Sequence, residues 1–526
     1  MAPTLFSLCR SSGAAPKPRV STYIRAAISV HLHSYPQLSQ TYVKCLNSHV
    51  FNPSKEQRYG NPDQATFQTA YNIQSRSLDD GILGVSRNGN LHKTLDELRQ
   101  LPPGEREGVL TNLSDTALNE LASDVNATGI LGAGGLSHDE KCTLFDTLAE
   151  SSTGKDLARL ASAFDSRDDT QLLAESVANK GSLQSRRTYI EAISPRTADN
   201  DYGRPFALGV AITEKVDKDA KAILTVLNSF DTGTSEGRAS FDQAINNLPQ
   251  SVLNNVAKAG INETIYSIDS RNHGVSYQPE AINKLLERAA KSEDASVKGK
   301  LFSSAANIVS GMRAIQNTPL VVSAPVANPH IQGITERMTA LMNTDARGVT
   351  NQLNQADIQG TGLELSAYIS EVLRNDPESG SKIIGEQLAQ LQGAGTGQSP
   401  TDFFEQQVPN RSGKLYHQNA QNLGYYVGAM RTGVDKLNAD VTKTGAIVKS
   451  ILSASISAAS LGRASGTVSG LTSLMVDEVV KQANGNRTKI VNELRGLAMP
   501  VYADGERYRG PAEDAFNSKA GYVRQQ

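Results

Sequence analysis

Apolar residues recur at intervals of three and four positions along most of the chain, a spacing that places them on one face of an α-helix. The pattern is clearest over 101–195, where it partly repeats itself. Leu101-Pro-Pro-Gly-Glu105 and Leu136-Ser-His-Asp-Glu140 each precede such a run, and they lie 35 residues apart. A helical repeat of this length cannot bury its apolar face alone, so neighbouring repeats must stack on it. We therefore predict an irregular array of helical hairpins.

Residues that start and stop helices agree with this prediction. Ser137 and Glu140 have the spacing of a capping box, in which each side chain satisfies a free backbone amide of the first turn. Ser182 is expected to cap a helix that ends near Ile193. Gly181 stands where the preceding helix ends, and we expect it to adopt the left-handed conformation found at many helix C-termini.

The helical pattern extends the predicted array over residues 92–392, with a proline-containing loop near 318–330 as a candidate subdivision. After this loop the pattern predicts three helices, over 331–343, 362–374 and 381–392. The stretch from Gly393 to Pro400 is the clearest linker in the chain, because three of its eight residues are Gly and it ends in Ser-Pro. Residues 401–526 are therefore predicted to form a separate helical C-terminal domain.

The N-terminal segment differs in composition, since residues 1–55 contain no Asp or Glu. We predict a disordered, acid-poor leader and linker over 1–91, with one short helix within 56–91. No uninterrupted apolar core of a Sec signal peptide is present. Three interpretations stay open: a mitochondrial transit peptide, the unfolded signal of a bacterial type III-secreted protein, and a plain disordered tail.

Composition supports an all-α fold. Trp is absent and aromatic residues make up only 5% of the chain, which favours helices with small, Leu-centred cores over a β-sandwich. The 52 basic and 54 acidic residues leave a net charge of −2, whereas a general nucleic-acid binder usually has a basic excess. We therefore expect no nucleic-acid partner.

A weakly charged stretch lies near the C-terminus. Between Lys449 and Asp477 the only charged residue is Arg463. The two uncharged runs on either side would each form a helix of roughly 20 Å, shorter than the ~30 Å hydrocarbon core of a bilayer. We predict an Ala/Gly/Ser-rich hairpin over 450–476, either buried in the protein or able to enter a membrane after partial unfolding. The residues that would contact a membrane or a protein partner are Ile451, Leu452, Ile456, Leu461, Leu471, Leu474 and Val476.

No motif in the chain predicts catalysis. The eight histidines do not stand at metal-ligand spacing, and the three cysteines form no Cys-x-x-Cys pair. The glycine-rich stretch 126–135 lacks the Lys-Ser/Thr of a phosphate-binding loop. Ser166-Arg-Asp-Asp169 is expected to cap a helix, and Cys142 to occupy a half-buried helix position. We predict no catalytic residue, no cofactor and no metal; a site assembled from distant residues stays open.

Three features occur together: an acid-poor leader, a helical body with degenerate repeats, and a C-terminal Ala/Gly/Ser-rich hairpin. In this organisation the whole chain resembles bacterial type III-secreted effector and translocon proteins, including the HrpF/NopX class. The resemblance implies a secreted effector or translocon-associated virulence protein, delivered into a host cell, that acts through protein contacts and through membrane contact by 450–476. Two alternatives remain: a helical-repeat scaffold in the cytoplasm or a mitochondrion, and an enzyme with a dispersed active site.

Overall fold

The computed structural model describes residues 64–77, 86–128, 134–198, 218–267, 273–316, 327–410, 412–460, 477–478, 481–482, 486–500 and 508–521. Over these ranges the regular structure is almost entirely helical, which confirms the predicted all-α class. The N-terminal residues 1–63 and most of the predicted hairpin, 461–476, lie outside the described residues.

The helices fall into three consecutive groups. The first group is α4 (Gln64–Ser77), α5 (Arg87–Gln100), α6 (Pro103–Asn112), α7 (Asp115–Val125), α8 (His138–Ala149), α9 (Gly154–Ala163), α10 (Arg167–Lys180), α11 (Leu183–Ile193) and α12 (Pro195–Ala198). The second group is α13 (Lys218–Leu227), α14 (Ser235–Asn247), α15 (Gln250–Gly260), α16 (Glu280–Ala290), α17 (Ala295–Gln316), α18 (Ala327–Thr344), α19 (Ala346–Ala356), α20 (Leu363–Asn375) and α21 (Pro377–Leu391). The third group is α22 (Pro400–Glu405), α23 (Gln418–Asp435), α24 (Val441–Ser460), α26 (Arg487–Leu497) and α27 (Pro511–Ala520).

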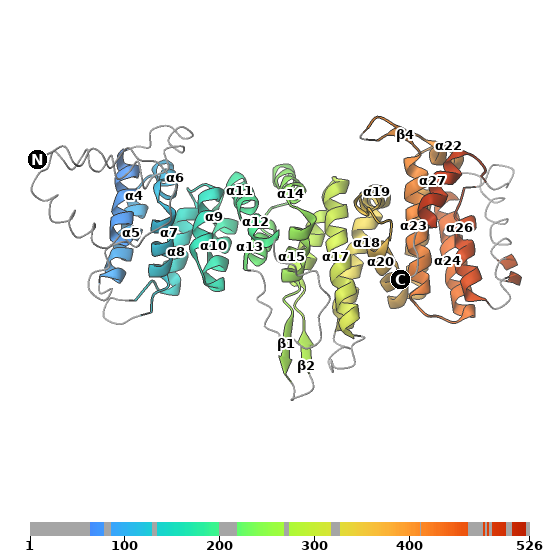
Figure 1. Cartoon of the computed structure of the whole chain (residues 1–526), viewed down its shortest axis with the longest axis horizontal. Coiled ribbons are helices and arrows are strands. Elements are labelled where there is room, and N and C mark those ends of the chain that lie inside the picture. Colours follow the sequence, from blue (N-terminus) through green and yellow to red (C-terminus); the bar gives the residue numbers. More distant parts are fainter. Residues whose placement is uncertain are drawn as a thin grey trace, which may run out of the picture.

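Two short antiparallel hairpins interrupt the helices. Strand β1 (Thr264–Ser267) pairs with β2 (His273–Ser276), with Thr264 opposite Ser276. Strand β3 (Val408–Pro409) pairs with β4 (Leu415–Tyr416). The β1–β2 hairpin projects from the row of helices (Figure 1).

The helices stack as an array in which most helices pack on one that lies two or three places further along the chain. One series of contacts joins α7, α9, α11 and α14, and a second series joins α8, α10, α13 and α15. Figure 1 shows the result as one long row, with α4 near one end and α26 and α27 near the other. The buried apolar residues form one cluster that continues from Ala70 to Ala520. The predicted irregular array of helical hairpins is confirmed.

Several corners between helices share one local structure. Leu113 and Leu248 each follow a helix, adopt extended backbone with ψ of 137° and 134°, and bury their side chains. The next residue, Ser114 or Pro249, is already the N-cap of the following helix. An extended residue turns the chain sharply, and its buried side chain fixes the direction of the turn. This two-residue corner explains how short helices follow one another without longer loops.

The predicted caps are present, with one exception. Glu140 accepts a hydrogen bond from the backbone amide of Ser137 at 2.9 Å, and Ser182 caps the helix that ends at Ile193. The prediction of a left-handed Gly181 is wrong, because its φ of −65° and ψ of 142° are extended. Gly181 is the extended residue of the corner between α10 and α11, and it leads directly to Ser182, the N-cap of α11. Glycine fits there because a Cβ atom would lie only 2.6 Å from the Val177 carbonyl oxygen.

Helical packing differs from the sequence expectation at three places. It begins at α4, inside the segment expected to be leader and linker, and this helix buries Ala70 and Ile73. The sequence pattern also missed α19, which buries Val349 and Leu353 between two expected helices. The neighbouring helix α18 begins at Ala327, within the expected loop at 318–330, whose first part lies outside the described residues.

The expected linker is a glycine turn between helices that are packed together. Gly393, Gly395 and Gly397 all have positive φ, which only glycine adopts without strain. However, α20 packs on α23 and α21 packs on α24, so the C-terminal helices continue the array. At Gly385 a Cβ atom would clash with the Ile451 carbonyl oxygen, because α21 and α24 approach so closely there.

A buried polar network also joins these two parts of the chain. Tyr426 of α23 donates a hydrogen bond to Gln387 of α21 at 3.0 Å. Gln387 in turn donates to the Tyr368 hydroxyl at 2.9 Å and to Asn343 at 3.0 Å. Burial raises the pKa of Tyr368 to about 12, so this hydroxyl stays protonated at neutral pH. The network fixes the position of α23 against α18, α20 and α21.

Candidate functional site

The residues predicted to contact a membrane or a partner divide into three groups. Ile451 and Leu452 are 0% and 2% exposed on α24 and belong to the core. Ile456 is half-buried one turn further along. Leu461, Leu471, Leu474 and Val476 lie outside the described residues. Within the described ranges no helix combines the length and the apolar character needed to cross a bilayer. Membrane contact by 450–476 stays a prediction.

The charged group at 166–169 has a structural arrangement. Ser166 accepts hydrogen bonds from the backbone amides of Asp168 and Asp169, which makes it the N-cap of α10. Asp169 is buried and pairs with Lys141 at 2.9 Å. Cys142 is half-buried as expected, and burial raises the pKa of its thiol, which lowers its reactivity. No three His, Cys, Asp or Glu side chains are grouped closely enough to hold a metal in the described part of the chain.

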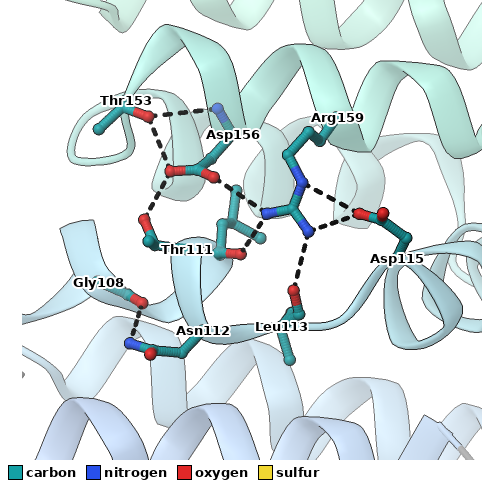
Figure 2. A network of polar contacts seen from close by, with 9 residues as sticks. Gly108, Thr111, Asn112, Leu113, Asp115, Thr153, Asp156 and Arg159 are labelled. Carbon is teal, nitrogen blue, oxygen red and sulfur yellow. Dashed lines mark hydrogen bonds and ion pairs between the residues drawn. The ribbon is translucent and has the colours of Figure 1, made fainter. Parts of the chain in front are cut away.

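Arg159 is the centre of the polar network shown in Figure 2. It extends from α9 to the corner between α6 and α7, where it donates to the carbonyl oxygens of Leu110 at 3.2 Å and Leu113 at 2.9 Å. It also pairs with Asp156 at 3.1 Å and with Asp115 at 2.6 Å. Because its donors are occupied by backbone and carboxylate oxygens, this arginine holds two hairpins together and has little capacity left for a ligand.

Other basic side chains along the array also donate hydrogen bonds to backbone carbonyl oxygens of a neighbouring hairpin. Arg288 donates to the Phe230 carbonyl at 3.0 Å, and Arg186 donates to the Ser229 carbonyl at 3.1 Å. Lys300 donates to three carbonyl oxygens at the end of α14, from Ile245, Asn246 and Leu248. The last carbonyls of a helix lack partners within it and carry partial negative charge, so a cation from a neighbouring hairpin stabilises them. These basic side chains therefore serve the fold.

A cleft of about 590 Å³ lies where α15, α17, α19 and α20 meet, and we call it the inter-helix cleft. Gln250 lines it from α15, Lys300 and Ser303 from α17, and Gln352 from α19. The loop 357–362 and Glu364 of α20 complete its wall. Its shape depends on a close helix contact, because a Cβ atom on Gly299 would lie 2.6 Å from the Gln352 Cβ atom.

Exposed apolar side chains mark the wall of the inter-helix cleft. Ile358 is 96% exposed and Leu363 is 51% exposed, and both line the cleft. The loop that carries Ile358 is held firmly, since the Asp357 carboxylate accepts from the Gly362 amide at 2.7 Å and from the Tyr425 hydroxyl at 3.3 Å. Gly360 has a φ of 64°, a left-handed conformation that favours glycine. The fold thus holds an isoleucine in water beside a cavity.

Two carboxylates also line the inter-helix cleft. Glu364 accepts a hydrogen bond from Ser303 at 2.6 Å, and burial together with the charge of Asp357 raises its pKa. Burial and the same two acids raise the pKa of Tyr425. Neither Asp357 nor Glu364 forms an ion pair with any basic side chain that the structure describes. The two carboxylates of the cleft therefore have no direct ionic partner among the described residues.

The chemistry of the lining is suited to binding. The residues that line the inter-helix cleft include carboxylates, side-chain amides and aliphatic groups, but no histidine and no cysteine. The Ser303 hydroxyl donates a hydrogen bond to the Glu364 carboxylate. The raised pKa of Glu364 means that this carboxyl group is difficult to ionise. Such a pair recognises a ligand more readily than it generates a nucleophile.

Sequence reasoning missed this site because its residues are spread from 250 to 364. One local feature pointed to it: Ile358 stands alone in the polar segment Asp357-Ile-Gln-Gly360-Thr-Gly362. Comparisons of the chain with models of known protein families and with curated proteins give no match. The site must therefore be interpreted from its own geometry.

Proposed function

We propose that this protein is a secreted bacterial effector that acts through protein contacts and binds its partner at the inter-helix cleft. The observation that carries the proposal is Ile358, which is 96% exposed on a loop fixed by Asp357 beside a cavity. Export is supported by the leader, since residues 1–55 contain no acidic residue.

The energetic argument concerns the cost of leaving Ile358 in water. Full burial of an isoleucine side chain contributes about 1.5–3 kcal/mol, and here the fold forgoes that gain. A partner that covered Ile358 and Leu363 would recover it. Because hydrogen bonds hold the loop, little conformational entropy would be lost on binding. An apolar group on a rigid loop beside a cavity therefore offers a partner a favourable burial at a low entropic cost.

The binding part of the proposal can be tested by photo-crosslinking with the full chain. A photo-reactive residue is placed at position 358, and a matched one at position 415, because Leu415 is also exposed, at 58%. We expect one host protein to crosslink from position 358 and not from position 415, and Ile358→Asp to abolish its co-purification. Equal crosslinking from both positions, or from neither, would contradict binding at this cleft.

The export part needs a separate experiment. A reporter fused to residues 1–75 should leave the producing cell under secretion-inducing conditions. If the reporter stays inside, the export part is wrong. A specific partner at position 358 would then favour a helical-repeat scaffold that acts in its own cell.

A further inference from the structure

We propose that the inter-helix cleft binds an extended peptide segment in which an arginine or lysine stands next to an aliphatic residue. The aliphatic side chain would pack on Ile358 and Leu363, and the cation would pair with Glu364 and Asp357. This inference rests on the proposed function, because it names the class of partner that the same site accepts.

The first argument is charge. The cleft is lined by two carboxylates and by one cation, Lys300. All three N–H groups of Lys300 donate to carbonyl oxygens at the end of α14, so they are not available to a ligand or to the acids. Burial and the like charge of Asp357 both raise the pKa of Glu364, so the ionised form of this carboxyl is disfavoured. A cationic side chain from a ligand would favour the ionised form of Glu364 and pair with both carboxylates.

The second argument is the pattern of hydrogen-bonding groups. Gln352 on α19 and Gln359 on the loop both line the cleft. Neither side-chain amide makes a hydrogen bond to any other residue that the structure describes. A side-chain amide both donates and accepts, so it can pair with the N–H and C=O groups of an extended backbone, whatever the peptide sequence. Two such free amides in the cleft favour a peptide over a purely apolar ligand.

The third argument is the placement of the apolar groups. Ile358 directly follows Asp357 in the chain, and Leu363 directly precedes Glu364. Both apolar side chains are exposed. An aliphatic side chain on them and a cation on the acids would therefore come from neighbouring positions of one ligand. A short stretch of one extended peptide could therefore contact both parts of the site.

The observations favour this ligand over an anion or a membrane surface. An anion would face two carboxylates and a lysine whose donors are already used. A lipid surface is flat on this scale, whereas the free amides line a concave site that a peptide can enter.

The experiment uses the full chain and a display library of random dodecapeptides. We expect enriched peptides that carry an arginine or lysine beside Leu, Ile or Val. For a synthetic enriched peptide, binding should weaken about tenfold when citrulline, which is neutral, replaces the basic residue. Binding should weaken to a similar extent in Glu364→Gln, and the two losses should not add, because both remove the same pair. Ile358→Asp should also weaken binding, whereas Leu415→Asp should not.

Any one of several results would overturn the inference. The first three are a library that yields no enriched peptide, a citrulline peptide that binds as tightly as its parent, and full additivity of the two losses. Self-association of the chain that Ile358→Asp abolishes would also overturn it, since the occupant would then be a second copy. If a host protein crosslinks from position 358 but tolerates Glu364→Gln, the proposed function stands and the peptide inference fails.

Discussion

Replacing Arg159 by alanine tests how the array is held together, because this side chain joins α9 to the corner between α6 and α7 (Figure 2). The change leaves the carbonyl oxygens of Leu110 and Leu113 without their partner. It also removes the cation beside Asp156, which is only 6% exposed but keeps its hydrogen bonds from Thr111 and Thr153.

The expected loss can be worked from these contacts. Each carbonyl that loses a charged donor costs about 1–3 kcal/mol, toward the lower end here because water can reach the site. The pair with Asp115, which is 84% exposed, adds less than about 1 kcal/mol. We therefore expect Arg159→Ala to lower the free energy of unfolding by roughly 2–4 kcal/mol. Arg159→Lys should restore little, because an ammonium cannot reproduce the planar fork that spans these partners.

Hydrogen exchange is the appropriate assay, because a repeat array can open locally and a global transition would average the effect. Peptides that cover α6, α7 and α9 should lose protection in Arg159→Ala, and peptides from α23 should not change. The matched control is Arg238→Ala, since the contacts of Arg238 are long: 3.4 Å to the Thr232 carbonyl oxygen and 3.4 Å to Glu293, which is 91% exposed. Arg238→Ala should lower the free energy of unfolding by less than about 1 kcal/mol. Equal effects of the two alanine variants would refute the reasoning.

Three further predictions concern the packing of α21, α23 and the cleft. Gly385→Ala should lower the free energy of unfolding in urea by about 1–3 kcal/mol, because the added Cβ atom would clash with the Ile451 carbonyl oxygen. The control is Gly311→Ala, where the added Cβ atom would meet no other residue within 4 Å. This variant should be as stable as the parent or more stable. Tyr426→Phe should cost about 1–3 kcal/mol by the same measurement, since Gln387 loses a buried donor; an unchanged midpoint would argue against the network. Glu364 has a raised pKa, so its contribution to stability is present below its ordinary value of 4.5 and is lost as pH rises through the folded value. Glu364→Gln should therefore have a higher melting temperature than the parent protein at neutral pH, and this difference in melting temperature should disappear in acid. A difference that does not change with pH would contradict the prediction.

Local chemistry in the sequence determined most of the helices. The three- and four-residue spacing and the caps at Ser137 and Ser182 act within one or two turns, so they are legible in a single chain. The helix α19 escaped detection because it buries few large apolar residues, and its place depends on α17 and α23. Gly181 was assigned the wrong conformation because a close backbone approach and a left-handed turn both select glycine.

Only the tertiary structure determined which helices and which residues are neighbours. The glycine turn at 393–397 has the composition of a linker, but whether helices pack across it depends on surfaces far apart in the sequence, such as Gly385 against Ile451. The same holds for Leu452, whose apolar character suits a membrane or a core equally until its neighbours are known. The inter-helix cleft combines residues from 250 to 364, and no local pattern encodes such a combination. Sequence fixes the short-range preferences of each helix, whereas a site needs the relative positions of several helices, which only the packing of their buried faces sets.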